Sequence, residues 1–247
     1  MNLPDLTRPE LLAVFLDFDD TLVEIADQTD AVPVRAETRK TLDLLQDALG
    51  GALAIVTGRD IELIDAMLDP FRCPVAGVHG LTRRDATGRW HARTVTTSFI
   101  DEVVRQLQPM VTEAPGLILE RKSTAVALHY RARPELEAVC LAAMESAVRC
   151  IDGVRLLRGK CVIEARPDGG DKGTAVADFL AEPPFAGRRP VFAGDDATDE
   201  DAFHLVNARG GITLKIGPGS TAATFRATDT AAFLAWLGAT ARRFTKG

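Results

Sequence analysis

The feature that most constrains this chain is an apolar run that stops abruptly at acidic residues. Residues 11–16 read Leu-Leu-Ala-Val-Phe-Leu, and Asp17-Phe18-Asp19-Asp20 follows directly. Six consecutive apolar residues are typical of a strand buried on both faces of a parallel sheet. Three carboxylates at its end repel one another unless a cation lies among them, and ligands bind at such strand ends in open α/β sheets. The pattern predicts a metal-assisted reaction centre; a solvated acidic turn or helix cap is the alternative.

The net charge of the chain limits the kinds of molecule that it can bind. A net charge of −6 argues against nucleic acid or an anionic membrane as the main partner, so an anionic small molecule would be held by local cations or a metal. No apolar run is long enough to span a membrane, and the first residues lack the basic and apolar regions of a signal peptide. The four cysteines form no Cys-x-x-Cys pair. We therefore expect a cytoplasmic protein with reduced thiols and no structural zinc site.

The spacing of apolar residues predicts alternating strands and helices at both ends of the chain. Leu42, Leu45 and Leu49 would share one face of a helix. Such βαβ alternation implies a parallel sheet with right-handed crossovers. In the first part we expect helices at 35–49 and 60–68 and strands at 11–16, 51–57 and 74–78. In the last part we expect helices at 171–180 and 199–207, strands at 190–193 and 212–216, and an amphipathic stretch at 226–237.

The rhythm changes near residue 87 and returns after residue 167. Between them the sequence predicts two successive helix–strand–strand units, which make an antiparallel sheet. Their helices are expected at 98–113 and 134–149, and their strands at 117–119, 124–130, 154–157 and 161–165. We therefore predict an α/β fold with a Rossmann-like parallel-sheet core, residues 1–91 and 166–247, interrupted by an inserted α/β cap, residues 92–165.

Three later motifs accompany the opening acidic run. A second apolar strand ends in Thr57-Gly58-Arg59, Lys172 opens a helix, and a third strand ends in Gly194-Asp195-Asp196-Ala197-Thr198-Asp199-Glu200. In this order the motifs resemble the four signatures of the haloacid dehalogenase-like (HAD) phosphatases. The last motif resembles that of one branch, the trehalose-6-phosphate phosphatases. The resemblance extends from Leu12 to about Trp236.

Hydrolysis of a phosphate ester needs a nucleophile, a proton donor for the leaving oxygen and fixed positive charge. Asp17 and Asp19 would point to the same side of an extended chain. The resemblance implies that Asp17 attacks phosphorus and that Asp19 acts as acid and then base. The residues alone do not distinguish which aspartate has which role.

The resemblance also implies a Mg²⁺ cofactor. It assigns the metal to Asp17, the backbone carbonyl of Asp19, and Asp195, with Asp196 and Asp199 holding metal-bound waters. Mg²⁺ favours a few oxygen ligands and keeps several waters. The alternative for the 195–200 cluster is capping of the next helix, with Thr198 as N-cap, which leaves Asp195 unexplained.

The phosphoryl group needs hydrogen-bond donors and a cation. The resemblance implies that Thr57 donates its hydroxyl, that the amides of Phe18 and Gly58 complete the cradle, and that Lys172 is catalytic. A lysine at a helix N-terminus is unfavourable for the helix dipole, which suggests a bound anion or the Asp17 carboxylate as its partner. Ordinary turn chemistry at residues 57–58 and a solvated surface lysine are the alternatives.

Substrate specificity is expected in the cap. Charged residues beside its apolar strands match the trehalose-binding motifs of the family, and His79 after the third core strand also matches. Carboxylates and ammonium groups on one strand face suit the hydroxyls of a disaccharide. Cross-strand salt bridging on a solvated face is the alternative. The cap residues assigned by the resemblance are Glu120, Lys122, Arg131, Lys160 and Glu164. The family usually has Gly where Asp20 stands.

The resemblance implies a stand-alone, monomeric enzyme that hydrolyses trehalose 6-phosphate, completing trehalose biosynthesis. A sister phosphatase for sucrose phosphate, mannosylglycerate phosphate or sugar phosphates in general shares the core motifs. A phosphomutase would have to keep water from the phosphoenzyme. A phospho-signalling receiver also combines aspartates, Thr, Lys and Mg²⁺, but it would leave Asp19 and the cap without a role.

Overall fold

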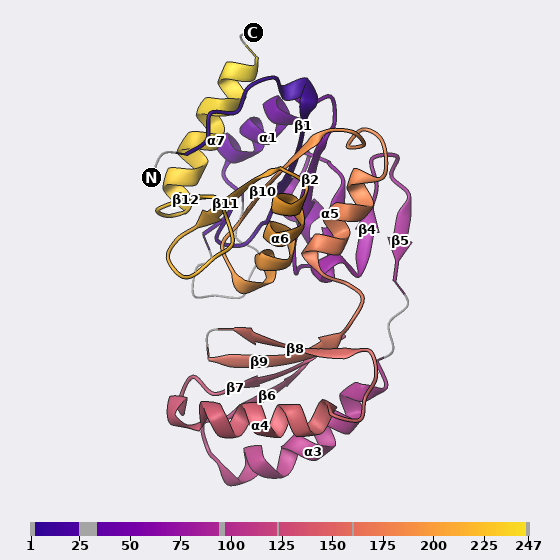
Figure 1. Cartoon of the computed structure of the whole chain (residues 1–247), viewed down its shortest axis with the longest axis vertical. Coiled ribbons are helices and arrows are strands. Elements are labelled where there is room, and N and C mark those ends of the chain that lie inside the picture. The colour runs from indigo at the N-terminus through magenta and orange to yellow at the C-terminus, as the bar shows by residue number, and fades with distance from the viewer. Residues whose placement is uncertain (1–2, 25–33, 94–96, 123, 160, 246–247) are drawn as a thin grey trace. The chain divides into compact units, whose positions relative to one another are not determined.

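The computed structural model describes residues 3–24, 34–93, 97–122, 124–159 and 161–245. Its contacts divide the chain into two compact units. The core unit comprises Met1–Arg93 and Gly170–Gly247, and the cap unit comprises Thr94–Gly169 (Figure 1). Each unit has its own apolar core. The predicted fold class, a mostly parallel α/β core with a smaller α/β cap, is confirmed.

The core unit is built on an eight-stranded sheet in the order β12-β11-β10-β1-β2-β3-β4-β5. The strands from β12 to β3 are parallel, and β4 and β5 are antiparallel additions. The central strand β1 is fully buried, as its apolar run predicts. The strands are β1 (Leu12–Leu16), β2 (Leu53–Val56), β3 (Val75–Gly77), β4 (Thr82–Arg84), β5 (Trp90–Ala92), β10 (Arg189–Gly194), β11 (Ile212–Ile216) and β12 (Phe225–Ala227).

Three short strands were absent from the sequence-based expectation. β4, β5 and β12 each have only three residues, so they carry too few apolar side chains to give a hydrophobic period. β5 and β12 are the two edge strands, and β4 lies between β3 and β5. The turn between β4 and β5 is stabilised by Asp85, whose Oδ1 accepts hydrogen bonds from the amides of Thr87 at 2.8 Å and Arg89 at 3.0 Å. Gly88 supplies the positive φ of 85° that this turn requires.

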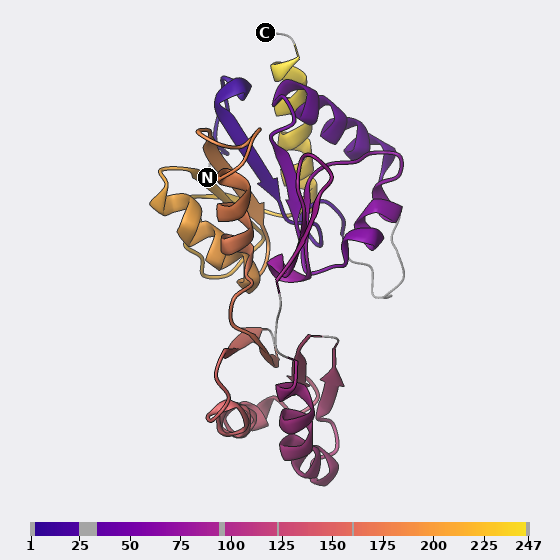
Figure 2. The ribbon, with the colours of Figure 1, turned by 90° about the vertical axis from the view of Figure 1, so that its right-hand side faces the viewer.

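Helices cover both faces of the core sheet. α5 and α6 lie on one face, and α1 and α7 on the other (Figure 2). Leu42, Leu45 and Leu49, expected on one helix face, are buried. Within the described residues no helix is both long and apolar enough to cross a membrane. The helices are α1 (Ala36–Ala48), α2 (Ile61–Leu68), α5 (Lys172–Leu180), α6 (Glu200–Ala208) and α7 (Thr230–Phe244), with 3₁₀ turns at Pro9–Leu11, Val78–Gly80 and Ala197–Asp199.

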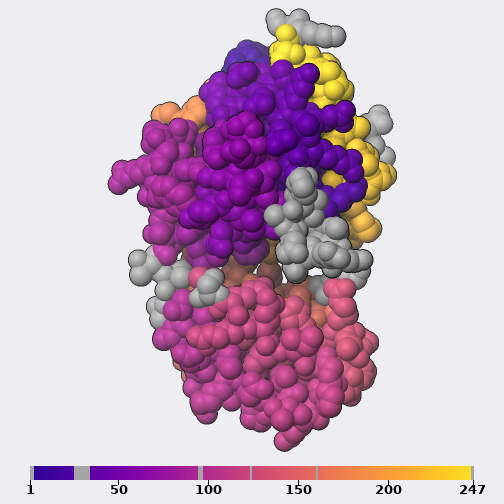
Figure 3. Space-filling view, turned by 180° about the vertical axis from the view of Figure 1, so that it is seen from behind, coloured from indigo at the N-terminus to yellow at the C-terminus, as the bar shows by residue number. Residues whose placement is uncertain are grey.

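The amphipathic stretch expected at 226–237 spans parts of two elements. Its first residues belong to β12, and the C-terminal helix runs over Thr230–Phe244. Asp229 sets the start, because its side chain accepts a hydrogen bond from the amide of Ala232 at 2.8 Å. Figure 3 shows the face of the core unit on which α7, in yellow, adjoins α1.

The cap unit pairs a four-stranded antiparallel sheet, ordered β6-β7-β9-β8, with two helices. The expected succession of two helix–strand–strand units is present. Val126, Leu128, Ile163 and Ala165 pack against the helices, so alternate positions of the same strands lie on the opposite face. The elements are α3 (Phe99–Glu113), β6 (Ile118–Arg121), β7 (Val126–His129), a 3₁₀ turn (Pro134–Leu136), α4 (Glu137–Val148), β8 (Val154–Gly159) and β9 (Val162–Pro167).

Candidate active site

Three neighbouring parallel strands deliver polar residues to one edge of the core sheet. Asp17 follows β1, Thr57 follows β2, and Asp195 follows β10. The strand pairing continues past the strand ends, because the Asp17 amide donates to the Ala193 carbonyl at 2.9 Å and the Thr57 amide to the Ala76 carbonyl at 2.8 Å. The site therefore starts from backbone held by the sheet.

Lys172 lies at the centre of this edge. It is the first residue of α5, whose N-cap Asp171 accepts a hydrogen bond from the Thr174 amide at 2.6 Å. The Lys172 side chain is only 3% exposed, and Nζ donates to Asp17 Oδ1 at 2.6 Å and to Asp199 Oδ1 at 2.7 Å. Two buried carboxylates thus share one ammonium group, which explains a lysine at a helix N-terminus.

The acidic motif after β10 forms a tight cap. Asp196, rather than Thr198, is the N-cap of the Ala197–Asp199 turn: its carboxylate accepts from the Thr198 amide at 2.8 Å, and Asp199 Oδ2 accepts from the Asp196 amide at 2.9 Å. Gly194 is required here, because a Cβ would lie 2.2 Å from Asp199 Cγ. The capping alternative is correct for Asp196 and Asp199, and Asp199 also holds Lys172.

Burial dominates the electrostatics of the cluster. It raises the pKa of Asp17 to about 7 and that of Asp199 to about 8, against the opposing effect of Lys172. Burial also raises the pKa of Asp195 to about 7, with Asp196 and Asp199 adding to the rise. Burial alone would lower the pKa of Lys172, but Asp17 and Asp199 outweigh it and raise that pKa. One ammonium group does not balance these carboxylates, so the cluster favours a further cation.

The donor atoms fit such a cation. Carboxylate oxygens of Asp17, Asp195 and Asp199 lie within 4.8 Å of one another. An all-oxygen set of this kind suits a hard divalent ion such as Mg²⁺. The predicted metal residues Asp17 and Asp195 are both in the group. Asp199 lies beside them, but its two oxygens already accept hydrogen bonds from Lys172 and from the Asp196 amide.

The Asp19 side chain is held by an arginine. Arg59 Nε donates to both oxygens of Asp19 at 2.8 Å, and Nη2 lies 2.7 Å from Oδ1. The Arg59 guanidinium also lies 6.0 Å from the centroid of the buried Phe18 ring. These contacts fix the direction of the Asp19 carboxylate.

Thr57, Gly58 and His79 form a second wall of the site. The Thr57 oxygen accepts from the Arg59 amide at 3.2 Å, which leaves its hydroxyl hydrogen to donate. The His79 amide donates to the Thr57 carbonyl at 2.9 Å, and His79 has a positive φ of 54°. A Cβ at residue 58 would lie 2.6 Å from the His79 ring, so the Gly58–His79 packing requires glycine.

The predicted sugar-binding residues of the cap gather on the sheet face opposite its helices. Glu120, Ala127 and Glu164 are cross-strand neighbours on that face. Lys122 Nζ lies 2.5 Å from Glu164 Oε2, and His129 Nε2 lies 2.8 Å from Glu120 Oε2.

Two predicted cap residues do not join these pairs. Arg131 is exposed in the turn after β7 and makes no ion pair with any described residue. Lys160 lies outside the described residues.

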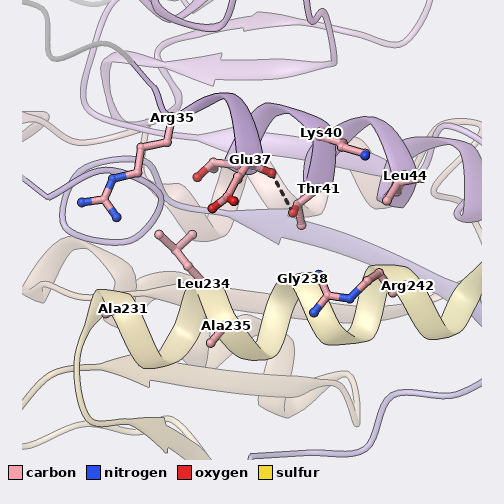
Figure 4. Close-up of a pocket in the computed structure, with 11 residues that line it drawn as sticks. Arg35, Glu37, Lys40, Thr41, Leu44, Ala231, Leu234, Ala235, Gly238 and Arg242 are labelled. Atoms are coloured by element: carbon pink, nitrogen blue, oxygen red, sulfur yellow. Dashed lines mark hydrogen bonds between the residues drawn. The ribbon is translucent and has the colours of Figure 1, made fainter.

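A separate cavity of about 650 Å³ lies between α1 and α7 (Figure 4). Leu44 and Leu234 contribute apolar lining, and Lys40 and Arg242 contribute charge (Figure 4). None of the predicted site residues lines this cavity.

The comparisons with known proteins agree with this geometry. A family model described as trehalose-phosphatase matches residues 15–233, which include every predicted site residue. The chain belongs to the trehalose-phosphatase family. The trehalose-6-phosphate phosphatase of Escherichia coli is 40% identical over 240 residues, covering 96% of this chain and 90% of the relative. A probable trehalose-phosphate phosphatase of Sinorhizobium fredii is 43% identical over 207 residues, covering 83% of this chain and 78% of the relative.

Solved structures agree on the fold. The C-terminal domain of the trehalose-6-phosphate phosphatase of C. albicans has a TM-score of 0.78 at 22% identity, covering 94% of this chain and 92% of that one. A trehalose-6-phosphate phosphatase related protein has a TM-score of 0.70 at 29% identity, covering 95% and 99%.

Membership in the trehalose-phosphatase family makes Asp20 an informative departure. Asp20 has a positive φ of 50°, a conformation that glycine adopts freely and aspartate tolerates. Its carbonyl accepts a hydrogen bond from the Thr230 hydroxyl at 2.5 Å. A glycine at this position would adopt the same backbone conformation without strain.

Sequence reasoning gave no role to three charged residues that the structure makes prominent. Arg59 stood inside the Thr57-Gly58-Arg59 motif and His129 lies two residues before Arg131, and each pairs with a predicted site residue. Lys215 lies inside the buried strand β11. A charge within an apolar run was the available signal for Lys215, because lysine is seldom buried without a reason.

Proposed function

We propose that this chain hydrolyses trehalose 6-phosphate to trehalose and inorganic phosphate, with Asp17 as the nucleophile. The observation that carries the proposal is the buried cluster in which Lys172 Nζ bonds both Asp17, at 2.6 Å, and Asp199, at 2.7 Å, at the end of β1. It occurs within the region matched by the trehalose-phosphatase model. A fixed cation beside a buried carboxylate favours attack on a phosphate ester.

The reaction takes two steps. A carboxylate oxygen of Asp17 forms a bond to phosphorus while the bond from phosphorus to the sugar oxygen breaks, and Asp19 gives its proton to that oxygen. Water then attacks the aspartyl-phosphate, Asp19 takes a proton from it, and the bond from phosphorus to Asp17 breaks. Inorganic phosphate leaves and both aspartates return to their starting state.

The remaining residues of the core site stabilise the charge on the phosphoryl group and orient it. Lys172 stays positively charged beside the phosphoryl oxygens, the Thr57 hydroxyl donates to one of them, and the amides of Phe18 and Gly58 donate to others. The His79 ring packs against Gly58 and holds that part of the backbone in place. Mg²⁺ held by Asp17, the Asp19 carbonyl and Asp195 would supply further positive charge. Asp196 and Asp199 orient that set from outside it.

The cap is proposed to recognise the sugar. Glu120, Lys122 and Glu164 present carboxylates and an ammonium group on one open sheet face. Disaccharide hydroxyls can replace the ion-pair partners of these side chains, and a sugar that fails to do so leaves polar groups unpaired. Arg131 and Lys160 are assigned to the same task by the family resemblance.

The test is phosphate release from trehalose 6-phosphate by purified protein, with Mg²⁺ and with a chelator, beside sucrose 6-phosphate and glucose 6-phosphate. We expect repeated turnover that needs Mg²⁺ and prefers trehalose 6-phosphate. Equal rates on all three substrates would indicate a general sugar-phosphate phosphatase. Absence of turnover on every substrate would contradict the proposal. We expect a monomer in the cytoplasm, which size-exclusion chromatography and cell fractionation can check.

A further inference from the structure

Lys215 is a buried lysine beside the candidate metal residues. It is 5% exposed and pairs across the sheet with Gly194, the residue before Asp195. Because side chains alternate along a strand, Lys215 shares a sheet face with Thr213. Thr213 bonds Asn207 of α6 at 2.8 Å, which places Lys215 on the face that α6 covers.

The ammonium group of Lys215 differs from the other cations at this edge of the sheet. Lys172 is held by Asp17 and Asp199, and Arg59 is held by Asp19. Among the residues that the structure describes, none forms an ion pair or a side-chain hydrogen bond with the Lys215 ammonium group. The side chain is buried, but its Nζ is not one of the buried nitrogens that lack a partner, so the ammonium group reaches solvent at this edge of the sheet.

Lys215 lies next to the candidate metal residues in the sheet. Its Cα partner on β10 is Gly194, which directly precedes Asp195, a carboxylate of the candidate metal set. Charges on neighbouring strands at this separation interact through space without a direct bond.

We propose that Lys215 is an electrostatic positioning residue of this site, whose ammonium group weakens divalent-cation binding and strengthens phosphate binding. The inference rests on the proposed function, a Mg²⁺-dependent phosphatase. Its physical basis is that Lys172 and Arg59 are each bonded by carboxylates, whereas no described residue neutralises the Lys215 charge by direct contact. Like charges repel the metal and unlike charges attract the anion.

This assignment predicts two opposite shifts when the charge is removed. In Lys215→Met, which keeps a side chain of similar length, Mg²⁺ should bind the metal-free protein about three- to tenfold more tightly. Inorganic phosphate should bind the Mg²⁺-saturated protein about three- to tenfold more weakly. Lys215→Arg keeps the charge and should stay within about twofold of the wild type in both measurements.

Both affinities are measured by isothermal titration calorimetry on the full chain, with thermal unfolding run in parallel. Lys40→Met is the matched control, because Lys40 is an exposed lysine of α1 outside the site. It should change neither affinity. Lys215→Gln repeats the measurement with a polar, neutral side chain if the Met variant does not fold.

Opposite shifts in a neutral variant, absent from Lys215→Arg and Lys40→Met, support the proposal. Unchanged affinities, or two shifts of the same sign, overturn it. If neither neutral variant folds while Lys215→Arg does, the charge serves the fold and the proposal also fails. Neither assay requires turnover of a sugar phosphate. A chain that does not hydrolyse trehalose 6-phosphate can still show the shifts, and an active phosphatase can lack them.

Discussion

The two units of this protein use the same kinds of charged residue in opposite environments. In the core unit the Lys172 side chain is 3% exposed and bonds two carboxylates that are themselves buried. In the cap unit the Lys122 side chain is 41% exposed and bonds Glu164, while His129 pairs with the half-exposed Glu120. The core pairs are fixed before any ligand arrives, and the cap pairs remain in contact with water.

The difference matches what each unit is proposed to do. A buried ion pair is costly to form and very costly to break, so it fixes the direction of reacting groups. An exposed ion pair contributes little, so its members can exchange partners at small cost. Chemistry needs the first property, and recognition of a sugar needs the second.

The largest expected effect comes from the nucleophile. Asp17→Asn removes the attacking carboxylate of the core and should lower the turnover rate at least about 10³-fold. Glu120→Gln, its counterpart in the cap, should retain measurable turnover at high substrate concentration. Steady-state phosphate release measures both. Comparable loss in the two variants would remove the division between chemistry and recognition.

The two lysines should differ in their effect on folding. Lys172→Met leaves two buried carboxylates without their shared cation and should lower the free energy of unfolding by about 3–5 kcal/mol. Lys122→Met removes a pair in which the lysine is 41% and the glutamate 13% exposed, so it should cost less, about 1 kcal/mol. Urea denaturation of the metal-free proteins gives both values. Equal losses of stability would show that the ion pairs of the two units contribute equally to folding, whatever their burial.

Metal binding should stabilise the protein through the core acids alone. Saturating Mg²⁺ should raise the free energy of unfolding by about 2–3 kcal/mol at a hundredfold excess over its dissociation constant, and a chelator should reverse this. Asp195→Asn should lose most of the effect, and Glu164→Gln should keep it. Thermal unfolding with and without Mg²⁺ is the measurement. A stabilisation that depends on Glu164 would place the ion elsewhere.

Substrate choice should respond to the cap and not to the core. Lys122→Met and Glu164→Gln should each raise KM for trehalose 6-phosphate about 10- to 100-fold. With p-nitrophenyl phosphate, which has no sugar hydroxyls, kcat/KM should stay within about threefold of the wild type. Parallel losses on both substrates would indicate damage to the reaction centre instead of to recognition.

The smallest effect is expected inside the core. Asp20→Gly removes a carboxylate near the site and relaxes a positive φ of 50°. It should change the free energy of unfolding by less than about 1 kcal/mol and leave kcat within about twofold. A large loss of activity would show that the Asp20 carboxylate takes part in the reaction, and would contradict its assignment as a residue without a catalytic role.

The elements that could be predicted from the sequence are those with a strong local pattern. The apolar run before Asp17 predicted a buried strand, the Leu42–Leu45–Leu49 spacing predicted a buried helix face, and both are present. The short strand β4 was not predicted, because a three-residue strand carries little periodicity. The start of α7 was not predicted either, because the Asp229 cap outweighs the apolar pattern. Local order is readable when one segment alone determines it.

The motifs correctly predicted that Asp17 and Asp195 lie at one edge of the sheet, because the parallel strands that precede them end together. Lys172, at the start of a helix, lies at the same edge. The helix-dipole argument also named Asp17 as a candidate partner of Lys172, 155 positions away, and the structure confirms that contact. No such signal pointed to the pairing of Arg59 with Asp19 across 40 positions, so only the folded chain reveals it. Pairwise contacts between distant segments need the three-dimensional structure.

The sheet order has a consequence for how the chain folds during synthesis. β1 lies between β2 and β10, and its register joins Leu12 to Arg189. The first strand made must therefore wait until β10, Arg189–Gly194, has been translated before its second neighbour exists, and such distant pairing forms slowly. The cap unit, Thr94–Gly169, is complete earlier. We expect the cap unit to fold on the ribosome while the sheet of the core unit still lacks β10, β11 and β12. Chaperones should therefore bind the exposed edge of β1 during synthesis.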